Sequence, residues 1–599
     1  IDPGKNFLWQ SDVSSLEPKI RAFLKQEGRF ECAVVEGVKD LLVKRTKEQL
    51  EYARTVLNSD SFQLDESVEI QLDPEKRTWI QDADDARKRQ FAHIQFQVSN
   101  YLLTDLKLPE ARKQLIHRYE LNLKRVEELS KSDMYSYVVN AFASALDPHS
   151  DYLSPEDTED FRIDMSLSLE GIGASLSSDD GFTVIQELIP GGAAARSKLL
   201  EPKDKIIAVG QGEAGALENV IDMNLRDVVR KIRGKAGSKV RIRILREKPE
   251  SQRFDVTLVR SKVKLEDKAA NVEYSTRTVG GKRLTLARLE LPAFYGDPTR
   301  RERSSYRDVA NAIQEIKKRK ADGIVLDLSQ NGGGLLEEAV RIVGLFINKG
   351  NVVATKDARK EVQALDDDDP LVQWEGPLVV LTSRLSASAS EIVAGALQDY
   401  KRAVLVGSDH TYGKGSVQAV LPLQNDLGIL KVTTGLFYIP GGRSTQHRGV
   451  ASDVVIPSIF AAEDVGEKYL DHSLNPDAIP AFLSPEANST GSWAPVTETE
   501  VERLRQQSKV RVTASKEFQE IEKELKELNE RRGPMKLSEL RKKDQEQKAK
   551  DKKKGKKEKP PKELAKERHA PHRTEAFQVL ADLIQLRTST PLAGAPRPR

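Results

Sequence analysis

Between residues 270 and 460, short apolar runs alternate with amphipathic stretches, and this alternation constrains the fold more than any other feature of the chain. The runs are Gly323–Leu328, Leu378–Thr382 and Ala403–Gly407, and the amphipathic stretches lie near 307–319, 335–347 and 388–400. Runs of five or six apolar residues suit buried strands, and the longer amphipathic stretches suit helices. Strands that alternate with helices predict a layered α/β domain, here residues 265–460.

The segments before this domain predict a different organisation. Residues 1–160 are helical in pattern, and Tyr135, Val138, Val139, Phe142, Ala145 and Leu146 fit one helical face. Asp147-Pro148 ends that stretch, because proline disfavours helix in the residue before it. Residues 165–250 carry short β-rich runs punctuated by glycine and one amphipathic helix at 225–232, which predicts a compact β-rich module.

The last segment, 465–599, is helical and polar. Phe518, Ile521, Leu525 and Leu528 form a short apolar stripe, and residues 576–584 form a final amphipathic helix that we expect to dock on the rest of the protein. Residues 541–570 are too charged to pack and predict a disordered linker. The fold class expected for the whole chain is therefore multidomain α+β, with helical regions at both ends.

Charge is unevenly distributed along the 599 residues. From Arg541 to Arg573 there are 15 Lys and Arg against 6 Asp and Glu, an excess of 9, while the net charge of the chain is +3. The remainder thus carries 3 − 9 = −6, so the protein is not a basic nucleic-acid binder. Two interpretations of the Lys-rich tract stay open, a solvated linker and a contact with anionic polymers.

Two further observations bear on processing and compartment. The sequence begins Ile1-Asp2-Pro3-Gly4, which predicts a processed or trimmed form, and no apolar run reaches the length that spans a membrane. The single cysteine, Cys32, cannot form an intramolecular disulfide and is expected to be a buried packing residue.

Three loops at the ends of the α/β strands carry possible chemistry. Ser386-Ala387-Ser388-Ala389-Ser390-Glu391 opens a helix, so the hydroxyl of Ser388 lies near free N–H groups. Asn331-Gly332-Gly333-Gly334 exposes backbone N–H groups suited to an oxyanion. For each, a plain structural role, helix capping or a flexible turn, is the alternative.

The third loop, Thr411 to Gln418, places Lys414 between two glycines. Desolvation there would lower the pKa of the amine and allow it to act as a general base, with Gln418 four residues on to orient it. An exposed loop lysine is the alternative. Together the three loops supply a nucleophile, a base and oxyanion donors, which is the set that acyl transfer requires.

Other catalytic arrangements are less favoured. A Ser-His-Asp triad has only His410, beside Asp409, as a tempting base, and we interpret it as a loop residue. The Gly-x-Ser-x-Gly elbow, the His-Glu-x-x-His metal helix and the Walker phosphate loop are all missing from the sequence. No metal or nucleotide cofactor is therefore expected.

The sequence resembles the C-terminal processing peptidases over roughly residues 120–460. The matching segments are Asp147–Pro155, Met165–Gly173, Asp327–Gly334, Ser386–Glu391 and Gly413-Lys414-Gly415. The resemblance implies a serine endopeptidase with Ser388 as nucleophile, Lys414 as base and Gln418 as its orienter. It also implies Ala389 and Gly332 or Gly333 as oxyanion donors, with Asp399 and Glu391 as supporting acids.

By the same resemblance, residues 165–250 look like a PDZ domain. The loop Glu170-Gly171-Ile172-Gly173 would bind a terminal carboxylate while the peptide adds as a strand. Val228 and Val229 of the module's helix would line the pocket for the last side chain. The alternative is a glycine turn in an inert module.

This sequence differs from the usual family pattern in two segments. The segment before the lysine, Gly407 to Gly413, is one residue longer than usual and lacks its proline, so that Ser388 and Lys414 are 26 residues apart. Ser329 stands where an arginine is common. Either change could alter activation or pocket shape without removing a catalytic atom.

The resemblance further implies a periplasmic enzyme of Gram-negative bacteria that acts on envelope proteins with apolar C-terminal tails, with a lipoprotein adaptor as partner. A second hypothesis is a non-catalytic PDZ scaffold on an inactive peptidase fold, which the intact Ser388 and Lys414 argue against.

Overall fold

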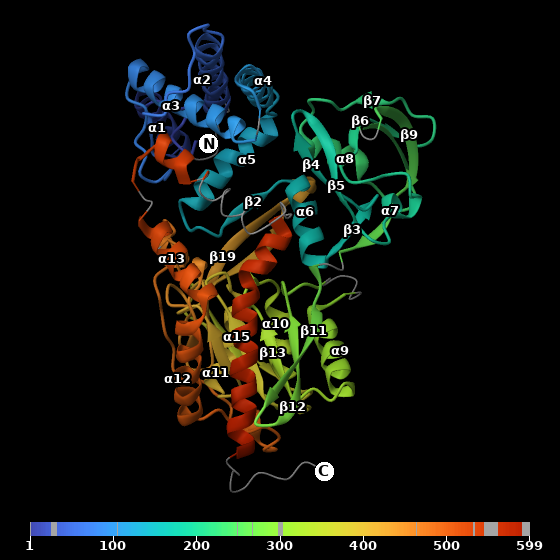
Figure 1. Ribbon diagram of the computed structural model, residues 1–599, viewed down its shortest axis with the longest axis vertical. Helices are drawn as coiled ribbons and strands as arrows, with labels where there is room; N and C mark the ends of the chain where they lie inside the picture. The colour runs from blue at the N-terminus through green and yellow to red at the C-terminus, as the bar shows by residue number, and fades with distance from the viewer. Residues whose placement is uncertain are drawn as a thin grey trace. The chain divides into compact units, whose positions relative to one another are not determined.

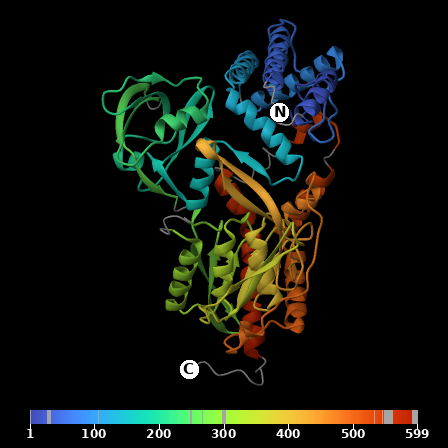
Figure 2. The ribbon, with the colours of Figure 1, turned by 180° about the vertical axis from the view of Figure 1, so that it is seen from behind.

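The computed structural model describes residues 2–25, 33–104, 106–247, 250–265, 268–296, 303–462, 464–530, 533–543, 545 and 561–589. The chain forms two compact units (Figures 1 and 2). The first contains residues 1–141, 168–264 and 532–558, and the second contains residues 142–167, 265–531 and 559–599. Cys32 lies outside the described residues, so its packing role stays a prediction.

A six-stranded sheet forms the centre of the second unit, in the order β11-β12-β13-β16-β17-β20. Its strands are β11 (Asn271–Val279), β12 (Lys282–Glu290), β13 (Gly323–Asp327), β16 (Leu378–Thr382), β17 (Val404–Gly407) and β20 (Val454–Val455). β11 is antiparallel to β12, and each later pair is parallel. β13, β16 and β17 are buried along their whole length, as their unbroken apolar runs require. The predicted layered α/β domain is confirmed.

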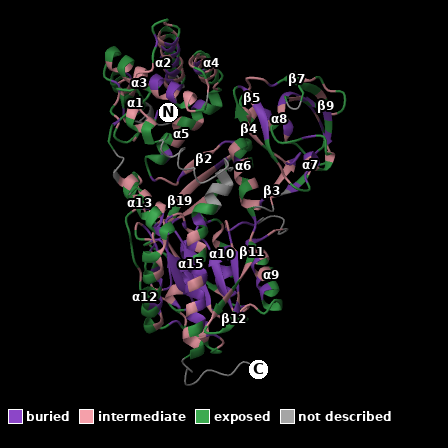
Figure 3. Ribbon diagram, viewed as in Figure 1, coloured by how far each residue is buried: buried purple, intermediate pink, exposed green. Residues whose placement is uncertain are grey.

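Alternate residues of each strand feed two separate cores, because successive side chains point to opposite faces of a sheet. Ile324 and Leu326 pack with the helices of one face, and Val325 packs with those of the other. The central strands are buried, as their purple colour in Figure 3 shows. The first face carries α9 (Ser305–Lys318), α10 (Leu336–Gly344) and α11 (Ala389–Asp399), and the second carries α12 (Glu498–Ala514), α13 (Lys516–Glu530) and α15 (Pro561–Ser589).

The predicted docking of the final helix is confirmed, but the predicted linker is partly wrong. The apolar face at 576–584 of α15 is buried against the sheet (Figure 1). Residues 541–543 and 561–570 are helical, although they were expected to be disordered. Within α15, His569 and His572 pack on Phe460 and Phe518. Residues 546–560, the centre of the Lys-rich tract, lie outside the described residues.

A second sheet of the same unit runs in the order β15-β14-β19-β18. Its strands are β14 (Gly350–Asp357), β15 (Val362–Asp367), β18 (Ser416–Pro422) and β19 (Ile429–Tyr438). The short β2 (Asp151–Leu153), followed by α6 (Pro155–Ser166), pairs with β19. This pairing brings the segment 147–150 beside the strand that follows the lysine loop.

The first unit begins with a helical part. Its helices are α1 (Gln10–Lys25), α2 (Ala33–Leu57), α3 (Ala83–Leu102), α4 (Leu108–Glu127) and α5 (Lys131–Ser144, which ends in the second unit). Leu57, Ile94 and Leu115 join α2, α3 and α4 in one core. β1 (Glu69–Ile70) pairs with β21 (Met535–Lys536), which the sequence did not predict.

The helix expected before Asp147 is present as α5, but its apolar stripe is not the packed face. Val139 and Phe142 are 40% and 50% exposed, whereas Met134 and Ala143 are buried. Met134 packs with Val35 and Val38 of α2, so the contact with α2 sets the orientation of α5.

The β-rich module lies at 168–264. Its main sheet has the order β4-β5-β6-β8-β9, with β7 paired to β6, and β3 pairs with β10. The elements are β3 (Ser168–Gly171), β4 (Ala174–Asp179), β5 (Phe182–Leu188), α7 (Ala193–Ser197), β6 (Lys205–Gln211), β7 (Glu218–Asn219), α8 (Leu225–Ile232), β8 (Lys239–Arg246), β9 (Gln252–Val259) and β10 (Ser261–Lys264). The predicted compact module with one good helix is confirmed.

Candidate active site

Ser388 occupies a strained position between β16 and α11. Its backbone has φ +56° and ψ −115°, a conformation that L residues rarely adopt and that costs about 1–3 kcal/mol. The turn places Ser388 at the N-cap of α11, where the first amides of the helix lack intrahelical acceptors. Such strain is held only by strong surrounding contacts, and Glu391 provides them.

The carboxylate of Glu391 is fully buried and joins the serine loop to the lysine loop. Its Oε2 accepts the backbone N–H groups of Ser388 (2.7 Å) and Lys414 (2.9 Å). Its Oε1 accepts the hydroxyl of Thr411 (2.6 Å) and the N–H of Gly413 (2.7 Å). The two backbones are therefore held by one side chain.

Burial raises the pKa of Glu391 to about 8, while its four donated hydrogen bonds act in the opposite direction. All four partners are donors, and the hydroxyl of Thr411 already accepts the N–H of Val450. Three of the four partners are backbone N–H groups, which cannot accept, so a protonated Glu391 could give its hydrogen only to Thr411 Oγ1, and the hydrogen bond that Thr411 now donates would be lost. The contacts thus favour the ionised form.

Lys414 follows β17 in the loop that leads to β18. Its Nζ donates to Oε1 of Gln418 at 2.7 Å, so the expected contact with Gln418 is present. Burial lowers the pKa of the Lys414 amine from 10.5, and the positive charge of Lys431 lowers it further. Both effects make it easier for the amine to lose its proton, while the carboxylates of Glu467, Glu391 and Asp147 act in the opposite direction.

Among the described residues, no hydrogen bond joins the Ser388 hydroxyl to Lys414 Nζ. A neutral amine has two hydrogens and one lone pair, and Gln418 accepts only one of the hydrogens. The lone pair therefore stays available for the proton of the serine hydroxyl.

The glycine loop Asn331–Gly334 lies directly against the serine. A Cβ on Gly333 would lie 2.9 Å from Cβ of Ser388 and 3.3 Å from N of Ala389, and the φ of Gly333 is +111°. The N–H of Gly333 is engaged, because it donates to Oδ1 of Asn331 at 2.8 Å. Gly332 faces open space, so Gly332 and Ala389 fit the oxyanion role better than Gly333.

Asp399 does not lie at the site. It is the last residue of α11, eleven residues along from Ser388, which is about 16 Å of helix. Its carboxylate accepts the N–H of Gly441 and pairs with Arg443 at 3.0 Å. Burial raises the pKa of Asp399. Its support is thus for the loop 441–443 and not for the chemistry at Ser388.

At the position that lacks the family's arginine, Ser329 donates its hydroxyl to Asp327 at 2.7 Å. The same carboxylate pairs at 2.7 Å with Arg288 of β12, which is buried. An arginine from a neighbouring strand therefore balances the charge of Asp327.

In the β-rich module, β4 is an edge strand of the described sheet, and it follows the loop Gly171–Gly173. α8 lies beside β4, which is the arrangement that an added peptide strand requires. The side chains of Ile172 and Val228 are buried in the module core. Val228 therefore does not line an open pocket, contrary to expectation, because it lies on the inward face of α8. Val229 is half-buried.

Two contacts of the site were missed from the sequence. His149 Nε2 lies 2.9 Å from the buried carboxylate of Glu467, which also accepts Gln446. Gln446 in turn accepts the N–H of Gly415, the residue after Lys414. The only available signal was the motif around His149, to which no role had been given. His410 contacts Asp409 and its neighbour's carbonyl, as expected for a loop residue.

Four family models match successive segments of this chain. The matching family models are "Tail specific protease N-terminal domain" at 1–156, "PDZ domain" at 160–245, "Peptidase family S41" at 285–456 and "C-terminal domain of tail specific protease" at 460–585. The Tail-specific protease of Haemophilus influenzae is 37% identical over 90% of this chain and 76% of its own length. The chain belongs to the tail-specific protease family.

Members of this S41 family are proteases, and this one carries a PDZ domain. The Carboxy-terminal-processing protease of Bartonella bacilliformis is 32% identical over 53% of this chain and 68% of its own. A solved PDZ domain of a carboxy-terminal protease from Vibrio cholerae, in complex with peptide, is 46% identical over 16% of this chain and 100% of its own, with a TM-score of 0.16. No helix in the described part of the chain is long and apolar enough to cross a bilayer.

Substitution of Gly333 by Ala should abolish turnover without unfolding the protein. The new Cβ would meet the carbonyl oxygen of Ala387 and Cβ of Ser388 at 2.9 Å, and φ +111° is unfavourable for alanine. The measurement is kcat on an unstructured polypeptide, with circular dichroism as the folding check. Gly37→Ala, where a Cβ meets nothing within 4 Å, is the matched control and should keep wild-type activity. Wild-type kcat in Gly333→Ala would contradict the close approach of the two loops.

Proposed function

We propose that this protein is a serine endopeptidase in which Ser388 is the nucleophile and Lys414 the general base. The observation that carries the proposal is the pair of loops that Glu391 fastens together, one with a strained serine at a helix start and the other with a desolvated lysine. Strain and a lowered lysine pKa are both typical of catalytic positions.

The reaction follows from these groups. The amine of Lys414 takes the hydroxyl proton of Ser388 as Oγ attacks the carbonyl carbon of the scissile peptide bond. The N–H groups of Gly332 and Ala389 stabilise the oxyanion of the tetrahedral intermediate. The ammonium of Lys414 then gives its proton to the leaving amine, and an acyl-enzyme on Ser388 remains. Water, deprotonated by the same amine, hydrolyses the ester and restores the serine.

We further propose that the PDZ domain captures the apolar C-terminal tails of substrates. The terminal carboxylate would bind the backbone of Gly171–Gly173, and the tail would extend β4 as an added strand. From the family resemblance we place the enzyme in the Gram-negative periplasm, with envelope proteins as substrates and a lipoprotein adaptor as partner. The alternative, a non-catalytic PDZ scaffold, is opposed by the intact dyad.

Replacement of Lys414 by Ala should lower kcat by about 10²–10⁴-fold, the usual contribution of a general base. In the wild type, kcat/KM should rise with pH as the amine loses its proton, and this limb should lie below pH 10.5 because burial lowers the pKa of Lys414. The measurements are pH-rate profiles on a fluorescent polypeptide. Ser388→Ala is the inactive reference, and undiminished turnover in Lys414→Ala would rule out the dyad.

Amidation of a substrate's C-terminus should raise KM, because it removes the carboxylate that the loop Gly171–Gly173 binds. The experiment compares free-acid and amidated forms of one unstructured polypeptide with an apolar tail, and a third form with a polar tail. A variant that lacks residues 168–264 should no longer distinguish the three forms. Equal KM values for all three forms in the wild type would contradict tail capture.

A further inference from the structure

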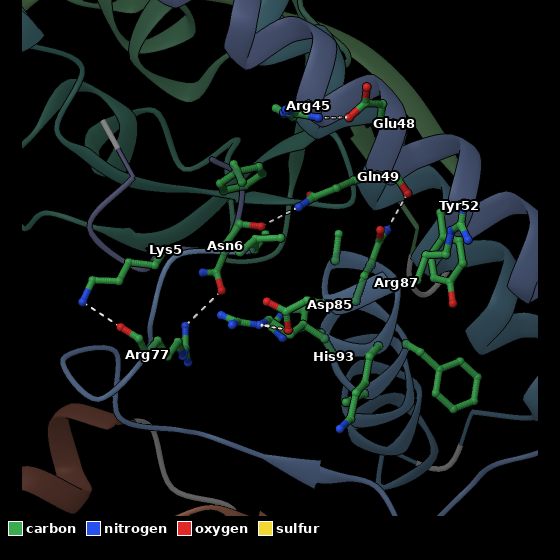
Figure 4. Close-up of a pocket in the computed structure, with 18 of the residues that line it drawn as sticks. Lys5, Asn6, Arg45, Glu48, Gln49, Tyr52, Arg77, Asp85, Arg87 and His93 are labelled. Carbon is green, nitrogen blue, oxygen red and sulfur yellow. Dashed lines mark hydrogen bonds and ion pairs between the residues drawn. The ribbon is translucent and has the colours of Figure 1, made fainter. Parts of the chain in front are cut away.

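The helical part of the first unit contains a large cleft, here called the basic cleft, lined by α2, α3, α4 and the segments 5–9 and 65–80 (Figure 4). Its volume is about 1460 Å³. Pockets for small ligands usually enclose about 300–1,000 Å³. The size therefore favours a segment of a polymer over a small metabolite.

The lining of the basic cleft is strongly cationic. The described lining residues include eleven Lys and Arg against five Asp and Glu, an excess of six positive charges. Within the described chain, Arg118 and Arg125 of α4 have no carboxylate partner. Among the residues that the structure describes, Arg77 donates to neutral oxygens alone, which include Oδ1 of Asn6 and the carbonyl of Gln71. Three other lining cations pair with carboxylates just outside the lining, Arg45 with Asp12, Lys76 with Asp73 and Arg87 with Asp84. Within the described residues, the lining arginines without a carboxylate partner are therefore Arg77, Arg118 and Arg125.

The positive charges of the basic cleft affect the pKa of His93. Its imidazole lies among the side chains of the basic cleft (Figure 4). Burial lowers the pKa of His93, and the charges of Arg77 and Arg118 lower it further. Two arginines from different segments thus act on one point of the cleft.

We propose that the basic cleft binds an acidic segment of a polypeptide. Guanidinium groups match carboxylates in pairs of parallel hydrogen bonds, and Phe7, Trp9 and Phe91 in the lining suit apolar side chains between the carboxylates. Nucleic acid fits less well, because duplex DNA carries one charge per about 1.7 Å. The acidic residues of the lining, such as Glu48 and Glu69, would repel so dense a polyanion.

The test is fluorescence anisotropy on the full chain with Ser388→Ala, which prevents cleavage. The probe is a fluorescein-labelled 14-residue peptide of alternating Glu and Leu or Phe, amidated at its C-terminus so that the PDZ domain cannot capture a carboxylate. Arg118→Gln with Arg125→Gln should weaken binding about five- to tenfold. The matched control, Arg253→Gln with Arg503→Gln, removes two exposed arginines outside the cleft and should change the affinity less than twofold.

Binding should also weaken as salt rises, and a Gln-for-Glu version of the peptide should not bind. Equal affinity of the cleft variant and the control variant would overturn the proposal. So would tight binding of inorganic polyphosphate or single-stranded DNA without binding of the acidic peptide, which would assign the cleft to a dense polyanion.

A second inference concerns Lys414, the general base that we propose, and it rests on the proposed function. Nε2 of Gln418 donates to the hydroxyls of Ser416 (2.9 Å) and Thr433 (3.1 Å). The hydroxyl of Thr433 donates to Oδ1 of Asp147 at 2.7 Å. The carboxylate of Asp147 is buried and also accepts Ser150 and the N–H of His149. Asp147 thus lies three hydrogen bonds from Lys414.

The direction of these bonds is fixed by proton count. An ionised carboxylate only accepts hydrogen bonds, so Thr433 must donate its one hydroxyl hydrogen to Asp147. The same hydroxyl can then only accept from Gln418. The amide NH₂ of Gln418 must then face Thr433, which turns its carbonyl oxygen toward Lys414 Nζ. The geometry points to Asp147 and Thr433 as positioning residues that set the orientation of the Lys414 amine.

The experiment compares Thr433→Val, Thr433→Ser and Ser150→Ala. Thr433→Val keeps the shape but removes the hydroxyl, so it should lower kcat at least tenfold with KM within twofold. Thr433→Ser restores the hydroxyl and should recover most of the activity. Ser150→Ala removes a hydrogen bond to the same carboxylate and also the acceptor of the Thr433 N–H (3.0 Å), but it leaves the chain from Asp147 through Thr433 to Gln418 intact, so it should lower kcat less than Thr433→Val does.

Ser388→Ala and Lys414→Ala are measured in parallel. If both abolish turnover while Thr433→Val retains wild-type kcat, the positioning role is overturned and the dyad stands. If Lys414→Ala retains turnover, the dyad itself fails. A loss in Thr433→Val that Thr433→Ser does not restore would also overturn the positioning role, because it would indicate packing.

Discussion

The active site depends on one buried carboxylate. Glu391 binds the backbone of Ser388 with the same oxygen that binds the backbone of Lys414, and it secures the rest of the lysine loop with the other. A positive φ at Ser388 is unfavourable, and the turn persists because these bonds would be lost if it relaxed. The spacing of Ser388 and Lys414, which we propose as nucleophile and base, is thus set through main-chain atoms, and neither side chain is used to hold the loops together.

The sheet brings the remaining parts together. β13, β16 and β17 are parallel neighbours, so the loops that leave them emerge at the same edge. The first loop supplies glycines, the second the serine and the third the lysine. The parallel order explains why residues spread over 331–414 meet in one place, as ligand and catalytic sites commonly do at the carboxyl ends of such strands.

Much of this could be predicted from the sequence. β13 and β16 are unbroken apolar runs followed by small residues, and both the strands and their loops were expected. The hydrogen-bond partners of individual side chains could not be predicted, because no local sequence pattern encodes contacts between distant segments. Glu391 was expected to be structural, but nothing in the sequence indicated that it would bind Lys414 as well as Ser388. Val228 was misplaced for a related reason, since the rotation of a helix decides which of its side chains face a pocket. The stripe on α5 was also misjudged, because the contact of Met134 with α2 fixed the packed face.

The pairing of β1 with β21 has a consequence for synthesis on the ribosome. Glu69 and Lys536 are partners although 467 residues separate them, and α15 covers the catalytic sheet from near the end of the chain. Contacts between such distant residues form late, because a long loop must close first. Neither unit can therefore reach its final packing before β21, in the first unit, and α15, in the second, have been made. A nascent chain that already contains Ser388 and Lys414 would still lack the helices that complete its core, which delays the appearance of a working peptidase until α15 has been synthesised.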